Sequence, residues 1–208
     1  MNKQTSTRDR VLEFIKRNGP VSVKALTDEI GITPMAIRGH LSKLEKEEFI
    51  RVDQVRQKLG RPLQVFSLTE KGEDFFPKNY DGFALELIED LKNLDGGKTL
   101  EKVVHLREER MIQTLADALK GCKNPAEKME AYCRFITEQG NMPQLTDQGD
   151  NSFLLNVANC AVHTIASQFS FPCETEMRIL KSVFAEAKVR RVQTLMDESQ
   201  TCAYLFEF

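Results

Sequence analysis

The segment ITPMAIRGHLSKLEKEEFI, residues 32–50, decides how the first part of this 208-residue chain folds. Thr33 is suited to cap a helix, and Pro34 at the first helical position loses nothing by lacking an N–H group. The apolar residues recur at the spacing of one helix face: Ile37, Leu41 and Leu44. The segment therefore predicts a helix that buries this face and presents the opposite one to solvent.

Two shorter helices are predicted before this one. The first begins near Thr7, carries an apolar stripe and stops at Gly19. Ser22 is placed to cap the second, which ends at Gly31. A helix, a turn containing glycine and another helix make the spacing of a helix-turn-helix, in which the third helix would be the recognition helix.

The outward face of this third helix has the chemistry of a nucleic-acid contact. Small, hydroxyl and cationic side chains can approach phosphates and base edges closely. The candidate DNA contacts on the helix and its cap are Thr33, Met35, Arg38, Gly39, Ser42 and Lys43.

A hairpin wing is predicted next. Two alternating runs, residues 49–55 and 63–68, flank a cationic tip that contains Lys58 and Arg61. An extended arginine beside glycine and proline suits a narrow minor groove. An isolated basic hairpin would be read as a solvated turn, but after a helix-turn-helix it favours DNA contact. Residues 1–78 are thus predicted to form a winged helix-turn-helix domain that binds double-stranded DNA.

Charge and hydropathy agree with this division. Residues 1–78 carry 15 basic and 11 acidic side chains, whereas residues 79–208 carry 14 and 20. A basic amino-terminal part and an acidic carboxy-terminal part are typical of a DNA-binding domain joined to a domain that does not contact DNA. The amino terminus lacks the apolar core of a secretory signal, and no run of roughly 18 apolar residues occurs. We expect a cytoplasmic protein with no membrane partner.

The middle of the chain, residues 79–120, is predicted to be a helical linker or dimerisation region. One apolar stripe holds Phe83, Leu87, Ile88 and Leu91, and a second holds Leu100, Val104, Met111, Leu115 and Leu119. Two-fold operators are usual for such DNA-binding domains, so these stripes are candidates for a homodimer seam. Packing onto the following domain is the alternative.

Residues 121–208 are predicted to form a small α+β domain, which makes the whole chain a mostly helical α+β protein. Asn124 and Pro125 start a helix whose buried face includes Cys133, so that cysteine is interpreted as core. A hairpin, further helices and two strands follow.

Five cysteines, an odd number in a chain expected in a reducing compartment, do not suggest a disulfide framework. They are core residues, reactive thiols or metal ligands. Cys160, Cys173 and Cys202 fall where predicted elements begin or end, and element ends that are distant in sequence can converge in space. Backbone N–H groups at such ends also stabilise thiolates.

Two segments carry a family resemblance. ITPMAIRGHLSKLEKEEFI (residues 32–50) and GRPLQVFSLTEKG (residues 60–72) resemble winged-helix regulators of the broad ArsR/DeoR-like group, except that Glu48 stands where a glycine often ends the recognition helix. NCAVHTIASQFSFPCETEMRILKSVFAEAKVRRVQTLMDESQTCAYLFEF (residues 159–208) is similar to the carboxy-terminal domain of SufR-type iron–sulfur regulators. This resemblance implies a [4Fe-4S] cluster held by Cys160, Cys173 and Cys202, and repression of iron–sulfur assembly genes.

The fourth cluster ligand stays open. Many cyanobacterial members of that family have a cysteine where this chain has Ala187. His163, three residues after Cys160, would share a helix face with it, and an imidazole can bind iron, although a lone histidine is more often an ordinary hydrogen-bonded residue. Cys122 in an exposed turn is another candidate, and water or an external thiol would leave a labile iron.

The sequence thus predicts a transcriptional regulator, not an enzyme, whose affinity for DNA depends on a [4Fe-4S] cluster. A zinc or thiol-redox sensor on the same fold is the first alternative. An iron–sulfur enzyme or electron carrier is the second, and it is disfavoured because no nucleotide loop, catalytic triad or carboxylate constellation is recognisable in the chain.

Overall fold

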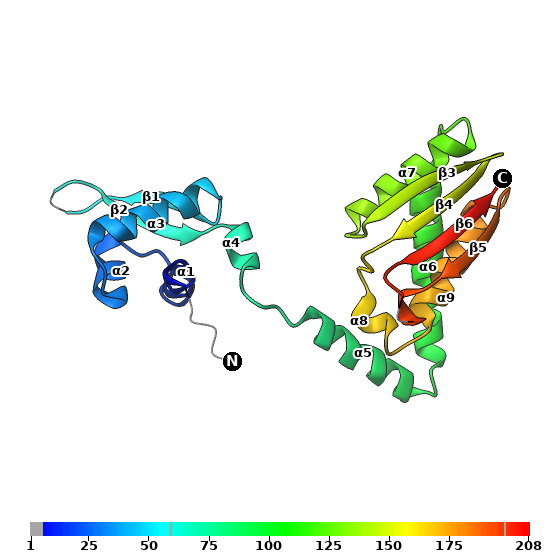
Figure 1. Cartoon of the computed structure of the whole chain (residues 1–208). Helices are drawn as coiled ribbons and strands as arrows, with labels where there is room; N and C mark the ends of the chain where they lie inside the picture. The colour runs from blue at the N-terminus through cyan, green and yellow to red at the C-terminus, as the bar shows by residue number, and fades with distance from the viewer. Residues whose placement is uncertain (1–5, 59, 198) are drawn as a thin grey trace. The chain divides into compact units, whose positions relative to one another are not determined.

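The computed structural model describes residues 6–58, 60–197 and 199–208, so Leu59 of the predicted wing tip lies outside it. The chain divides into two compact units, residues 1–78 and 79–208, each with its own hydrophobic core (Figure 1). The predicted fold class is confirmed: the chain is a helix-rich α+β protein with an amino-terminal winged helix-turn-helix.

Three helices form the core of the first unit: α1 (Thr7–Asn18), α2 (Val23–Ile30) and α3 (Pro34–Lys46). The predicted caps are in place, since the Thr33 side chain accepts a hydrogen bond from the Ala36 N–H at 3.2 Å and Ser22 does the same for Ala25. The apolar stripes meet in one cluster that includes Leu12, Leu26, Ile37, Leu41 and Leu44.

The wing is an antiparallel pair, β1 (Ile50–Val55) and β2 (Leu63–Leu68), with Ile50 opposite Leu68. An isolated bridge between Val21 and Phe66 ties its base to the segment between α1 and α2. The short helix α4 (Glu70–Asp74) closes the unit. Its Gly72 lies so close to the hairpin that a Cβ there would come within 2.0 Å of the Phe49 carbonyl oxygen.

The end of α3 shows that glycine is not needed there. Glu48 takes a left-handed backbone conformation with φ of 62°. The Phe49 N–H donates to the Leu44 carbonyl at 2.8 Å, and the Glu48 N–H donates to the Glu45 carbonyl at 2.9 Å. These two bonds make a Schellman cap. A left-handed cap usually needs glycine, yet Glu48 forms one here.

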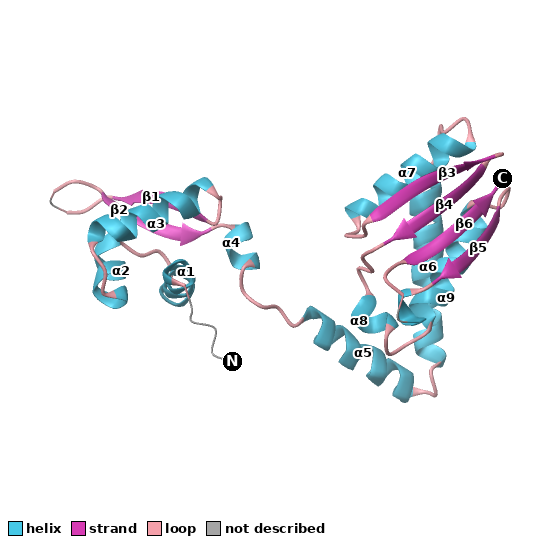
Figure 2. Cartoon of the chain, in the orientation of Figure 1, coloured by secondary structure: helices cyan, strands magenta, loops and turns pink. Residues whose placement is uncertain are grey.

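The second unit is a two-layer structure of helices on one side of a sheet (Figure 2). Its helices are α5 (Tyr80–Leu94), α6 (Lys98–Ala118), α7 (Pro125–Glu138), α8 (His163–Ala166) and α9 (Phe171–Val183). Its strands are β3 (Pro143–Gly149), β4 (Ser152–Val157), β5 (Lys188–Gln193) and β6 (Cys202–Glu207). They form an antiparallel sheet in the order β3-β4-β6-β5.

Both predicted stripes of the middle region lie in this second unit, and no unit boundary falls near residue 120. The second stripe packs inward, because Leu115 of α6 and Leu119, the residue directly after the helix, belong to the core. The first does not: α5 has no buried residue, and Phe83 and Leu87 are 60% and 47% exposed. Within the part of the chain that the structure describes, no helix is both long and apolar enough to cross a membrane.

Candidate nucleic-acid interface and cysteine site

All eight predicted DNA contacts are exposed in the first unit. The recognition helix α3 turns its apolar stripe inward and presents the predicted contacts outward, with Met35 83% exposed. These solvent-facing residues are Thr33, Met35, Arg38, Gly39, Ser42 and Lys43 on α3 and its cap, and Lys58 and Arg61 in the wing.

Within the described residues, the cations of this face have no carboxylate partner, whereas several other cations of the unit do. Arg8 pairs with Glu47 at 2.7 Å, and Arg51 pairs with Asp53 at 3.4 Å. Among the residues that the structure describes, no ion pair engages the predicted contacts Arg38, Lys43, Lys58 and Arg61. Their positive charge is therefore available to a phosphate backbone.

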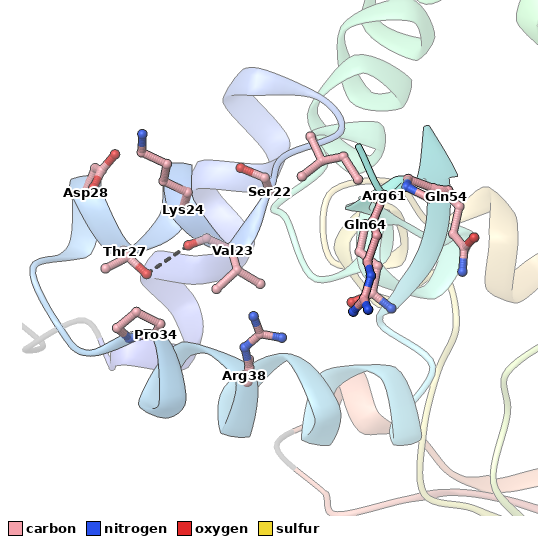
Figure 3. A pocket seen from close by; sticks show the side chains of 12 residues that line it. Ser22, Val23, Lys24, Thr27, Asp28, Pro34, Arg38, Gln54, Arg61 and Gln64 are labelled. Atoms are coloured by element: carbon pink, nitrogen blue, oxygen red, sulfur yellow. Dashed lines mark hydrogen bonds between the residues drawn. The ribbon is translucent and has the colours of Figure 1, made fainter. Parts of the chain in front are cut away.

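A groove of about 890 Å³ separates α2 and α3 from the wing. In Figure 3, Arg38 of α3 reaches into it on one side, while Gln54, Arg61 and Gln64 of the hairpin lie on the other. The two glutamines were missed by the sequence analysis. Gln54 stands directly opposite Gln64 in the β1–β2 ladder, so the two-residue alternation of the predicted strands could have identified them.

In the second unit, strand pairing brings two of the candidate cysteines to one end of the sheet. Cys202 begins β6 directly opposite Val157, the last residue of β4. Cys160 follows Val157 by three residues. Because paired positions share a face of the sheet, the Cys202 side chain lies on the same side as buried Val157, the side that the helices cover.

Cys173 reaches the same end through α9 and β5. It lies in the first turn of α9, where its carbonyl oxygen accepts a hydrogen bond from the Arg191 guanidinium. Arg191 belongs to β5 and stands opposite Tyr204 of β6, two residues beyond Cys202. The loop after β4, the first turn of α9 and the start of β6 thus carry the three cysteines to one end of the sheet.

The thiols are close enough to influence each other electrostatically. Burial raises the pKa of Cys160, the Val162 N–H opposes this, and the charges of Cys202 and Glu176 add to the rise. Burial also raises the pKa of Cys173, and Arg191 opposes it, while Glu176, Cys160 and Cys202 add to it. A charge on Cys202 therefore contributes to the raised pKa of both thiols.

Over the described ranges, no three His, Cys, Asp or Glu side chains are grouped so as to hold one metal ion. The thiolates of a four-iron cluster each bind a different iron, so they need not crowd around one centre. Among the residues that the structure describes, the buried Nε of Arg191 has no hydrogen-bond partner, and an anionic group bound beside Cys173 would provide one.

The other proposed ligands lie differently. His163 does not share a helix with Cys160, because α8 begins only at His163, and its side chain is exposed. The His163 N–H donates to the Cys160 carbonyl at 3.1 Å, so the two residues share a hydrogen-bonded turn but not a helix. The Cys122 thiol donates to the Glu127 carbonyl at 3.7 Å. Cys133 packs against the core on α7, and burial raises its pKa.

Three polar residues beside the cysteines were missed by the sequence analysis. Glu176, Arg191 and Tyr204 form one network, in which the Tyr204 hydroxyl donates to Glu176 at 2.5 Å and Arg191 lies 3.5 Å from the same oxygen. The sequence spacing could have identified two of them. Glu176 is three residues after Cys173 on a helix, and Tyr204 is two residues after Cys202 on a strand, so each shares a face with a cysteine.

Comparison with known proteins bears on the first unit. Residues 5–51 match a family described as winged helix-turn-helix DNA-binding. No curated protein matches the chain. The first unit is thus a winged helix-turn-helix DNA-binding domain, as its exposed cations and recognition helix indicate.

Solved structures with some likeness include RV1404 from Mycobacterium tuberculosis, at 16% identity and a TM-score of 0.31, covering 52% of this chain and 75% of that one. A mutant of ZitR from Lactococcus lactis has 20% identity, a TM-score of 0.28 and coverages of 53% and 77%. PadR from Bacillus subtilis, in complex with operator DNA, has 15% identity, a TM-score of 0.30 and coverages of 63% and 92%.

Proposed function

We propose that this protein is a DNA-binding transcriptional regulator. The observation that carries the proposal is the set of exposed cations on α3 and the wing, which no carboxylate neutralises within the described residues. The recognition helix would enter the major groove, and Arg61 would reach the neighbouring minor groove or phosphates. Such a contact is salt-dependent, because each cation that meets a phosphate releases a counterion.

The regulation would come from a [4Fe-4S] cluster bound by Cys160, Cys173 and Cys202. Support comes from their meeting at one end of the sheet, from the contribution of Cys202 to the raised pKa of Cys160 and Cys173, and from the cation of Arg191 beside Cys173. When bound, the cluster would supply redox and oxygen sensitivity. The resemblance to SufR-type regulators extends the proposal to repression of iron–sulfur assembly genes.

The regulator would act as a homodimer. The exposed apolar face of α5 supports this, since Phe83, Leu87 and Leu94 present 60%, 47% and 72% of their surface to solvent. A second copy of the same face would cover it in a two-fold dimer. The three thiols lie on elements of the unit that carries α5, so holding or releasing the cluster would alter how two DNA-binding domains are presented to a two-fold operator.

A zinc or thiol-redox sensor remains the alternative on this fold. A reactive sensor thiol usually has a lowered pKa. Burial instead raises the pKa of Cys160 and Cys173, which argues against thiol oxidation as the signal. It does not distinguish zinc from a cluster, because both bind cysteine as the thiolate.

The test is anaerobic purification followed by an absorption spectrum, iron and sulfide assays, and selection of bound sequences from a random DNA pool. We expect a brown protein with iron and sulfide in equal amounts, and tighter binding of the selected DNA by the loaded form. A colourless protein that contains zinc, or no metal, would overturn the cluster and leave DNA binding standing. Failure to select any sequence would overturn the regulator itself.

A further inference from the structure

The side chain of Glu176 is held from one side only. Its Oε2 accepts the hydrogen bond from the Tyr204 hydroxyl at 2.5 Å and lies 3.5 Å from the guanidinium of Arg191. No hydrogen bond within the described part of the chain engages the other oxygen, Oε1. The carboxylate is therefore fixed in orientation and still has a free donor atom.

This carboxylate belongs to the cysteine site. Glu176 follows Cys173 by three residues on α9, so the two share a helix face. Its partner Arg191 also donates to the Cys173 carbonyl, and its partner Tyr204 follows Cys202 by two residues on the same face of β6, so its contacts connect the carboxylate to two of the cysteine-bearing segments. Its side chain is 43% exposed, so it is accessible from the site without being a freely moving surface group.

We propose that Glu176 is the fourth protein ligand of the cluster, through Oε1, and that Tyr204 and Arg191 position it. This inference rests on the proposed cluster. Metal-binding carboxylates are characteristically held by hydrogen bonds from neighbouring groups, and here a hydroxyl and a guanidinium provide them. The exposed side chain of His163 has no such hydrogen-bonding support among the residues that the structure describes.

The chemistry of such a ligand suits sensing. A carboxylate is a harder donor than a thiolate and matches iron less well than sulfur does in a cluster. The iron at that corner would be the most easily lost, while three thiolates would keep the other three. Arg191 offsets the additional negative charge of the carboxylate.

Anaerobic reconstitution of substituted full-length protein tests the assignment. Glu176→Gln should lower bound iron by about one atom per cluster and speed bleaching in air, giving the electron paramagnetic resonance signal of a three-iron cluster. Glu176→Cys should restore the full iron content and slow the bleaching, because a thiolate replaces the carboxylate. Glu174→Gln, an exposed position on the same helix, and His163→Ala should both behave as wild type.

The outcomes separate the two proposals. If wild type binds no cluster, the proposed function fails and the ligand assignment fails with it. If wild type binds a cluster and Glu176→Gln keeps its iron and its stability in air, only the ligand assignment is overturned.

A measurement on wild-type protein guards against variants that fail to fold. Electron–nuclear double resonance of the reduced protein, grown with glutamate isotopically labelled at the side-chain carboxyl carbon, should show coupling to that carbon. The absence of coupling in a protein that carries the cluster would also overturn the assignment.

Discussion

At the scale of single residues, Glu48 takes a backbone conformation that usually selects glycine. Its φ of 62° places the Cβ close to the neighbouring carbonyl, at a cost of roughly 1–2 kcal/mol for a residue with a side chain. The Schellman bonds and the hydrogen bond from the Thr69 hydroxyl to the Glu48 carbonyl, at 2.5 Å, hold the turn in spite of that cost. The turn fixes where the recognition helix ends and the hairpin begins.

Replacing Glu48 with glycine should therefore stabilise the first unit. We expect Glu48→Gly to raise its free energy of unfolding by about 1 kcal/mol, because the strain is relieved while the hydrogen bonds remain. Urea unfolding followed by circular dichroism measures the change. Glu48→Ala is the matched control: it removes the same side-chain charge but keeps the strain, and it should leave stability nearly unchanged. Equal effects of both substitutions would show that charge, not backbone conformation, matters there.

Cys133 is interpreted as a core residue and not as a metal ligand, and its substitution tests this interpretation. Cys133→Ala should reduce stability by about 1 kcal/mol through the small cavity it leaves, while iron content and cluster absorbance stay at wild-type levels. Thermal unfolding and iron assays check both parts. A folded variant without iron would make Cys133 a ligand and contradict the interpretation.

At the scale of elements, the recognition helix and the wing lie on two sides of one groove. Arg38 enters it from α3, and Arg61 lies on the hairpin side. The bridge between Val21 and Phe66 and the contact of Gly72 with Phe49 fix the hairpin to the helical part of the unit. The spacing between helix and wing is thus set by the fold, and a bound duplex would meet both at once.

Arg61→Ala tests the wing. The substitution should weaken DNA binding and lower the slope of log affinity against log salt by about one, as expected when one phosphate or minor-groove contact is lost. Titrations of the selected DNA over a range of salt concentrations measure the slope. Arg17→Ala is the control, since Arg17 is 76% exposed on α1 and pairs with Glu13 outside the groove. Unchanged affinity at every salt concentration would remove the wing from the mechanism.

The α5 helix tests the dimer. Leu87→Glu introduces a charge into its exposed apolar face, which should convert a dimer to a monomer without unfolding either unit. Analytical ultracentrifugation reads the change directly, and DNA binding should weaken because one domain must then bind alone. Lys92→Glu, a charged exposed position on the same helix, is the control. A dimer that survives Leu87→Glu would place the seam elsewhere.

At the scale of the whole molecule, local rules predicted most of the fold. Caps such as Ser22 and Thr33, the stripe on α3 and the alternation of the hairpin are each set by a few neighbouring residues, and the structure confirms them. The cysteine site was harder to predict, because strand order and the docking of α9 decide which side chains meet. Hence Glu176 and Arg191 were missed. His163 was suggested as a ligand by a helix expected to include Cys160, whereas α8 begins only at His163.

The three candidate ligands should act as one unit. Serine at Cys160, Cys173 or Cys202 should abolish or strongly destabilise the cluster, because each thiolate comes from a different segment of the chain and none can replace another. DNA binding should weaken while the first unit keeps its circular dichroism and its stability. Iron assays and DNA titrations under anaerobic conditions check this. Retention of iron in all three variants, or equal DNA affinity of the iron-free and loaded proteins, would contradict cluster sensing.

The position of Cys202 opposite Val157 also limits how this chain can change length during evolution. Side chains alternate along a strand, so inserting or deleting one residue within β6 ahead of Tyr204 would move either Cys202 or Tyr204 to the other face of the sheet. The stretch between Cys160 and Cys173, in contrast, contains loops and the short helix α8, and its length can vary at lower cost. Related chains should accordingly accept insertions between the first two cysteines and reject them in the last strand.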